Sequence, residues 1–166
     1  VIPNQFIPAV EKGVREVLGG GAISGHPVVD VKVTVYDGKH HSVDSKEIAF
    51  VTAGRKAMLA AVREARPIVL EPIVEIDIEA PDGTLGDITG DLSSRRGIVT
   101  GTANGAAGTM RVRGQAPLSE LSGYQMRLNA LTSGQGRYTI ALSHYEAVPP
   151  QVQQQLASAW KVHDED

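Results

Sequence analysis

Two adjacent histidines, His40 and His41, are the side chains most suggestive of chemistry in the first half of the sequence. Imidazoles often bind metals, but neighbours on an extended segment point to opposite sides, and only two carboxylates lie nearby in sequence. Such a set does not make a metal site, so we expect none. With Gly38 and Lys39 these histidines form a polar loop after an Asp-Gly turn signal, and exposed loops of this kind on rigid scaffolds often recognise partners.

A second set, Ser143, His144 and Glu146, contains the residue types of a hydrolase triad. On a strand, however, Ser143 and His144 should face apart, and no loop suited to an oxyanion is evident. We therefore expect no nucleophilic catalysis and interpret His144 as a packing or hydrogen-bonding residue at a strand end.

Two glycine-rich stretches, Gly19–Gly21 and the series Gly101, Gly105 and Gly108, could suggest a phosphate loop. Neither is followed by Gly-Lys-Ser or Gly-Lys-Thr at the start of a helix, as a phosphate loop requires. We interpret them as linker and hairpin glycines, so this chain should hold no cofactor.

Arg95 and Arg96 lie at the predicted end of a helix. Cations there complement the negative end of the helix dipole, and arginines also bind phosphate. The sequence leaves both roles open, one structural and one a contact with RNA.

The first 70 residues predict two helices and one strand. Apolar residues at helical spacing from Phe6 to Leu18 indicate a helix that ends at the glycine cluster. Alternating valines predict a half-buried strand over residues 27–36. A capping box of Asp44 and Glu47 should begin the second helix, and Pro67 should follow its end. Its buried face should comprise Ile48, Val51, Met58, Leu59 and Val62.

The rest of the chain predicts the order strand, helix, strand, strand, helix, strand, a ferredoxin-like βαββαβ sandwich in an α+β protein. The strands are expected near residues 73–79, 98–102, 109–115 and 137–145. Thr84 should cap the first helix and a left-handed Gly97 should close it, while Ser119 should cap the second. A terminal helix should follow Pro149-Pro150 and continue to about Trp160.

In this topology the first and third strands are central neighbours. Arg111 and Arg113 should therefore lie beside the acidic row Glu75, Asp77 and Glu79 and form cross-strand ion pairs.

Composition limits the possible functions. The 166 residues are 42% hydrophobic but only 4% aromatic, so a stacking platform for RNA is not expected. The net charge of −3 argues against an unspecialised nucleic-acid binder. Absence of cysteine removes disulfides and thiolate metal sites, and no apolar stretch is long enough to span a membrane, so we expect a cytoplasmic protein. Nine basic and seven acidic residues before residue 71, against seven and twelve after it, suggest two units.

Taken together, these motifs resemble the C-terminal part of the translation elongation factor G family over nearly the whole chain. Some of these motifs mark only turns and the ends of helices and strands, but their order and spacing are specific. The residues that carry the resemblance are Val1–Gly13, Gly25–Asp30, Tyr36–Gly38, Val43–Ser45, Leu70–Pro72, Gly90–Asp91, Arg95–Gly97, Ser122–Tyr124 and Ser143–Glu146.

The resemblance implies three segments. Residues 1–67 would be the C-terminal half of domain IV, a truncated ribosomal-protein-S5-domain-2-like α/β unit whose tip enters the decoding region of the small ribosomal subunit. Residues 68–149 would be domain V, near the GTPase-associated rRNA of the large subunit, and residues 150–166 a terminal helix and acidic tail. GTP and Mg²⁺ would belong to a G domain that this chain lacks.

For individual residues, the resemblance implies that His41 faces tRNA and mRNA during translocation, with Gly38, Lys39 and His40 in the same loop. Arg95 and Arg96 remain candidates for rRNA contact. Asn129 and Gln135 stand where the family commonly has basic residues, which should weaken phosphate contacts there.

Other functions remain open. The basic tip is also consistent with a paralogue of the family that acts in ribosome recycling or during stress. A ferredoxin-like regulatory module that binds a small metabolite would explain residues 73–149 alone, since that fold hosts unrelated functions. An acylphosphatase-type enzyme lacks an arginine and asparagine cradle, because Pro81-Asp82-Gly83 stands after the first strand. With partner strands missing, residues 27–36 should also promote self-association.

Overall fold

The computed structural model of the protein describes residues 1–43 and 45–160. It divides into two compact units: a helical unit of Val1–Val69 with the segment that begins at Pro149, and a sheet unit of Leu70–Val148. The helices are α1 (Ile7–Gly20), α2 (Glu47–Glu64), α3 (Leu85–Ser94), α4 (Tyr124–Thr132) and α5 (Pro150–Ala159), and the strands are β1 (Leu70–Pro81), β2 (Ile98–Asn104), β3 (Thr109–Pro117) and β4 (Arg137–Ala147). Short 3-10 turns, η1 (Asn4–Phe6), η2 (Asp82–Thr84) and η3 (Leu118–Leu121), precede α1, α3 and α4.

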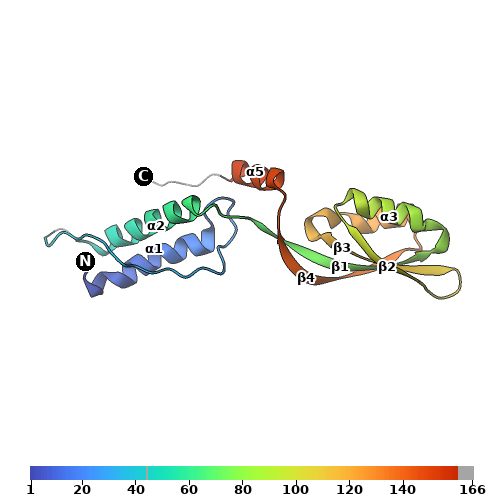
Figure 1. Ribbon diagram of the computed structural model, residues 1–166, viewed down its shortest axis with the longest axis horizontal. Helices are drawn as coiled ribbons and strands as arrows, with labels where there is room; N and C mark the ends of the chain where they lie inside the picture. The colour runs from blue at the N-terminus through green and yellow to red at the C-terminus, as the bar shows by residue number, and fades with distance from the viewer. Residues whose placement is uncertain (44, 161–166) are drawn as a thin grey trace. The chain divides into compact units, whose positions relative to one another are not determined.

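Helices α1 and α2 pack side by side and run parallel (Figure 1). Their apolar residues meet in the same order along both helices: Ala9 and Val10 contact Phe50 and Val51, and the next cluster along α1 contacts Met58 and Leu59. The backbones approach closely at Gly54, where a Cβ atom would lie 2.6 Å from the carbonyl oxygen of Val10.

The predicted first helix is confirmed, and its end has a clear cause. Gly21 adopts φ of 82°, which glycine reaches without steric cost, and its amide donates to the carbonyl of Val17 at 2.8 Å. The second helix is also confirmed, with extended Lys46 before its first residue. Asp44 of the predicted capping box lies outside the described residues. Ile48 was expected in the core but is 68% exposed, because Phe50 and Val51 supply that turn's contact with α1.

The strand predicted over residues 27–36 is wrong. This segment forms no ladder, Asp30 within it adopts a left-handed φ of 58°, and Val29, Val31, Val33 and Val35 remain 43–60% exposed. A strand needs a neighbour to hydrogen-bond its backbone, and the described residues supply none here. The amide of Val28 instead donates to the carbonyl of Leu18 at 2.8 Å.

Helix α5 belongs to the helical unit, and Gln153 bonds it to the residues just before β1. The side-chain amide of Gln153 accepts from the backbone N–H of Val69 and donates to the carbonyl of Pro67, both at 3.0 Å. These bonds satisfy backbone groups just before β1, where no helix or sheet would pair them. The terminal helix predicted after Pro149-Pro150 is thereby confirmed through Ala159.

The sheet unit has the predicted βαββαβ order. Its four antiparallel strands follow the spatial order β2-β3-β1-β4, with α3 and α4 packed on one face (Figure 1). Alternation in β1 buries Val74, Ile76 and Ile78 against these helices. Leu92 of α3 and Leu128 of α4 complete the apolar core, in which each is at most 1% exposed.

The open face of the sheet carries the predicted ion pairs. Arg111 makes two bonds to Asp77, the shorter at 2.6 Å, and Arg113 approaches the same carboxylate at 3.5 Å. Arg137 of the edge strand β4 pairs with Glu79 at 3.0 Å. These arginines are exposed to solvent, so the pairs add little stability and mainly favour the observed register.

Three predicted helix ends differ from the structure. Arg96, with φ of 57°, takes the left-handed position expected of Gly97. Gly123, also left-handed, precedes α4 in place of Ser119, which lies within η3. Thr84 does precede α3, but its hydroxyl donates back to the carbonyl of Pro81 at 2.7 Å and does not cap the helix.

Candidate functional site

The predicted tip loop, residues 37–42, is positioned by the parallel packing of α1 and α2. Two parallel helices need a connection that returns along their whole length, and residues 21–46 make that return. The loop therefore comes back beside the start of the chain, where His40 Nδ1 lies 3.1 Å from the carbonyl oxygen of Val1. At Gly38 an added Cβ atom would overlap the side chain of Ile2.

Short hydrogen-bonded contacts shape the loop itself. The amide of Gly38 donates to Asp37 Oδ1 at 2.7 Å. Ser45 accepts from the amide of His41 at 3.0 Å and its hydroxyl donates to the carbonyl of the same residue. Side-chain bonds of this kind replace the missing backbone ladder and give the exposed loop a defined path.

The two histidines of the loop have different surroundings. A carbonyl oxygen can only accept a hydrogen bond, so His40 carries its proton on Nδ1 and, when neutral, offers Nε2 as an exposed acceptor. The ring of His41 makes no hydrogen bond or ion pair with the residues described, and Lys39 is exposed beside it. The structure thus brings Gly38, Lys39, His40 and His41 together, with His40 tethered and His41 available to meet a partner.

Arg95 and Arg96 lie in the sheet unit, at the end of α3, and both engage carboxylates. Arg95 pairs with Asp91 at 2.9 Å and donates to the carbonyl of Glu120 at 2.6 Å. Arg96 forms a two-pronged pair with Glu71 at 2.7 and 2.9 Å and a further bond to Glu120 at 3.1 Å. These contacts give both arginines a structural role in the unit.

The charge balance of this cluster shows in its pKa values. Hydrogen bonds to Glu71, with a further contribution from Glu120, raise the pKa of Arg96 despite partial burial. Burial alone would raise the pKa of Asp91, but the guanidinium groups of Arg127 and Arg95 outweigh it and lower that pKa. Burial raises the pKa of Tyr124, beneath Arg95, to about 12, with a further contribution from nearby Asp91.

Ser143 and His144 of β4 were expected to face apart, and this is wrong. Ser143 Oγ lies 2.8 Å from His144 Nδ1, and His144 Nε2 lies 2.6 Å from Glu146. The ladder with β1 shifts register between Ile73 and Val74, which leaves Ser143 unpaired in a β-bulge. The bulge turns neighbouring side chains toward each other, and nothing in the local sequence signals it.

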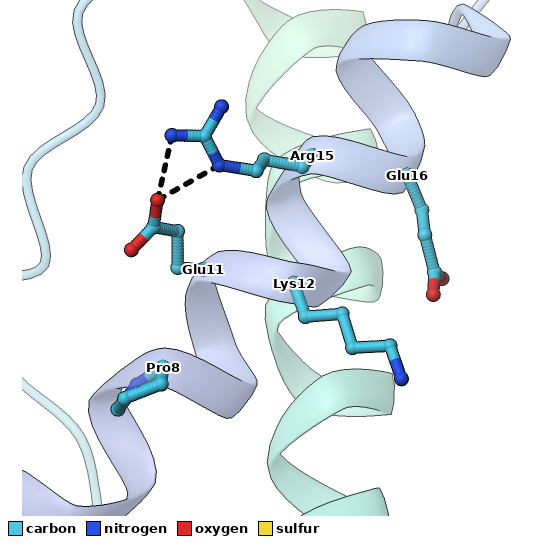
Figure 2. A pocket seen from close by; sticks show the side chains of 5 residues that line it. All are labelled: Pro8, Glu11, Lys12, Arg15 and Glu16. Carbon is cyan, nitrogen blue, oxygen red and sulfur yellow. Dashed lines mark hydrogen bonds and ion pairs between the residues drawn. The ribbon is translucent and has the colours of Figure 1, made fainter.

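Surface hollows add no further chemistry. The first, with a volume of about 520 Å³, is a shallow groove along the exposed face of α1 (Figure 2). Arg15 and Glu11 pair there at 2.7 Å, one helical turn apart, beside Lys12 and Glu16. The second, of about 460 Å³, lies on the sheet among Glu75, Asp77, Thr100 and Arg113.

Residues 1–43 and 45–160 contain no cluster of three or more histidine, aspartate or glutamate side chains placed to hold a metal ion. In the same part of the chain, no helix combines the length and apolar character needed to cross a membrane.

Family models match both units. The model described as "Elongation factor G, domain IV" matches residues 1–66, and that described as "Elongation factor G C-terminus" matches residues 68–156. A similar curated protein is the elongation factor G of Aquifex pyrophilus, 45% identical over 156 residues, which are 94% of this chain and 22% of that protein. The chain therefore spans about a fifth of the length of this relative.

A solved structure is also similar. A crystal structure of a protein from Thermus thermophilus superposes with a TM-score of 0.75 at 37% identity and covers 96% of this chain and 24% of that one.

Proposed function

Because the chain belongs to the elongation factor G family, we propose that it is the ribosome-binding portion of a translational GTPase that promotes tRNA-mRNA translocation. The observation that carries this proposal is the tip loop. Gly38, Lys39, His40 and His41 are presented together on a loop that is anchored to the start of the chain and otherwise exposed. No bond needs to be made or broken by this loop for it to act on RNA contacts.

Within the tip loop, His40 and His41 have different proposed roles. His40 is held by the carbonyl of Val1 and positions the loop. His41 supplies a compact donor and acceptor that can replace hydrogen bonds between codon, anticodon and decoding region as tRNA moves. Lys39 adds a cation that attracts phosphate and holds the loop near the RNA backbone.

The nucleotide chemistry would lie elsewhere in the factor. The two matched models describe domain IV and the C-terminus, so GTP and Mg²⁺ are assigned to a G domain outside this chain. We assign this chain no catalytic residue. Its helical unit would extend into the small ribosomal subunit, and its sheet unit would bind the large subunit.

For the sheet unit we propose docking near the GTPase-associated rRNA of the large subunit, with Arg95 and Arg96 as candidate contacts. Their guanidinium groups are already bonded to Asp91, Glu71 and Glu120. Contact with phosphate would therefore use only the N–H groups that remain, and these arginines should contribute less to binding than Lys39.

Single-turnover translocation on ribosomes tests the proposal, using a full-length factor that carries residues 1–166. His41→Ala should slow translocation by more than about tenfold, or about 1.4 kcal/mol of barrier. Lys39→Ala should have a smaller effect that shrinks as salt is raised, because it removes a screened phosphate contact. Lys12→Ala, on the exposed face of α1, removes the same charge away from the tip and serves as the matched control (Figure 2).

The outcomes separate the alternatives. If His41→Ala and Lys12→Ala translocate at the same rate, the role given to the tip is wrong. A factor that does not translocate but still splits ribosomes would move the function to recycling. If it does neither, and the chain binds amino acids or nucleotides in calorimetry, the metabolite-binding alternative gains support.

A further inference from the structure

Three steps in the chain place glycine after aspartate or asparagine: Asp37–Gly38, Asp82–Gly83 and Asn104–Gly105. At such steps the glycine amide nitrogen can attack the preceding side chain, because no Cβ shields it. We propose that Asp37–Gly38, and not the other two steps, is a site of spontaneous isoaspartate formation in the folded protein. This modification of the tip loop does not depend on the proposed function.

The reaction needs only water. The Gly38 nitrogen forms a bond to Cγ of Asp37, the carboxyl C–O bond breaks, and water leaves, which gives a five-membered succinimide. Water then adds to one of the two ring carbonyls, the bond between that carbon and the ring nitrogen breaks, and the nitrogen takes up a proton. Addition at Cγ restores aspartate, whereas addition at the former backbone carbonyl leaves the main chain running through the side-chain carbon. The net composition and mass are unchanged.

The geometry at Asp37 favours the first step. The Gly38 amide donates to Oδ1 of Asp37 at 2.7 Å, which keeps the attacking nitrogen next to the carboxyl group, so attack on Cγ needs only loss of the amide proton and rotation of the Asp37 side chain. Asp37 is exposed to water, and residues 31–41 form no helix or strand. Within the described residues, the Gly38 amide donates to no other acceptor, so nothing holds the nitrogen away.

The other two steps are held in regular structure. The Gly105 amide donates to the carbonyl of Thr109 at 2.9 Å and closes the β2-β3 hairpin. Gly83 lies inside the 3-10 turn η2, between β1 and α3, and the hydroxyl of Thr84 donates to the carbonyl of Pro81 at 2.7 Å across that turn, which holds the backbone of the Asp82–Gly83 step in one conformation. Reaction at either step would require local unfolding of the sheet unit, which costs free energy.

Isoaspartate would alter the tip in a definite way. It adds one methylene group to the main chain between Tyr36 and Gly38 and shortens the side chain that carries the carboxylate. The added methylene group would change the position of Gly38 against Ile2 and the alignment of the bond from His40 to Val1. Ageing of the protein would thus act first on the loop that carries Lys39, His40 and His41.

Peptide mapping of the 166-residue chain after incubation in heavy-oxygen water tests the proposal. Each succinimide that hydrolyses takes up one solvent oxygen, and fragmentation by electron transfer distinguishes isoaspartate from aspartate. Rates at each step are compared between the native chain and the chain in urea. Asp37→Glu is the matched variant, since it keeps the charge but lengthens the side chain and disfavours ring closure.

In the native chain, Asp37–Gly38 should react within about twofold of its rate in urea, whereas Asp82–Gly83 should slow by more than about tenfold, or about 1.4 kcal/mol. The reaction at Asn104–Gly105 should also be slower in the native chain than in urea. Label at position 37 should disappear in Asp37→Glu. The proposal is overturned if folding protects Asp37–Gly38 as strongly as Asp82–Gly83, or if no isoaspartate forms at Asp37.

Discussion

Residues 27–36 and strand β1 have nearly the same sequence pattern but different structures. Both alternate apolar and polar side chains, yet β1 is a central strand with neighbours on both sides, and residues 27–36 form no ladder. Ile76 and Ile78 of β1 are at most 1% exposed, whereas Val31 and Val33 are more than 40% exposed. Alternation therefore specifies which side chains share a face, but a strand forms only where partner strands are present.

The same comparison explains how the tip loop is built. In the sheet unit, backbone hydrogen bonds fix the register, and ion pairs on the open face reinforce it. In the loop, the carboxylate of Asp37, the hydroxyl of Ser45 and the carbonyl of Val1 do that work. These few contacts leave the polar side chains accessible, which suits a recognition loop.

The largest expected effect comes from truncating one apolar side chain in each region. Ile78→Ala should lower the free energy of unfolding by about 2–5 kcal/mol, because it leaves a cavity between β1 and the helices. Val33→Ala should change it by no more than about 0.5 kcal/mol, since its side chain is already half in water.

Urea unfolding followed by far-ultraviolet circular dichroism measures both variants. Fluorescence of Trp160, the only tryptophan, follows the helical unit and serves as an internal reference. Equal losses in Ile78→Ala and Val33→Ala would contradict the comparison, because residues 27–36 would then be packed as β1 is.

The sequence predicted what depends on local pattern. The order of elements in the sheet unit and the pairing of Arg111 with Asp77 both follow from periodicity and the antiparallel topology. The loop that holds Gly38, Lys39, His40 and His41 also follows from the sequence, because Asp-Gly signals a turn, whereas the role of this loop stays a prediction. What the sequence could not provide was the anchor to Val1, which exists only because α1 and α2 run parallel.

The remaining differences come from contacts between residues far apart in the chain. Arg96 takes a left-handed conformation because Glu71 and Glu120 hold its guanidinium, which offsets the cost that would otherwise favour Gly97. The bulge at Ser143 depends on how β4 pairs with β1. Neither feature has a signal in its own neighbourhood of the sequence.

An intermediate effect is expected at Asp91, where the sheet unit holds a charge with two arginines. The folded state lowers the pKa of Asp91 below 3.8, so its stabilising contribution is present above the unfolded pKa and is lost as the pH falls through the folded pKa. Asp91→Asn should therefore reduce the free energy of unfolding by about 1–3 kcal/mol at neutral pH. The difference from the natural chain should vanish in acid.

Urea unfolding over a series of pH values from neutral to acid measures this difference. Glu75→Gln is the control, because it removes an exposed carboxylate of β1 that makes no ion pair with the residues described. If Asp91→Asn were as stable as Glu75→Gln at every pH, the bonds from Arg95 and Arg127 would contribute nothing measurable.

The smallest effect on stability should accompany a clear effect on association. Residues 27–36 present exposed valines and a backbone that forms no ladder with the described residues, which favours pairing with a second extended segment. We therefore expect the 166-residue chain to self-associate as its concentration rises in sedimentation. The double variant Val31→Ser, Val33→Ser should weaken this association while changing the free energy of unfolding by no more than about 0.5 kcal/mol.

Ile98→Ser provides the decisive control for this last comparison. Ile98 is 68% exposed on β2, an edge strand that already pairs on one side with β3. If unpaired backbone in residues 27–36 drives association, Ile98→Ser should leave it unchanged. If Ile98→Ser weakens the association instead, the chains associate through the edge of the sheet. A strictly monomeric chain would mean that residues 27–36 do not pair with a second copy, because their contacts with α1 are sufficient.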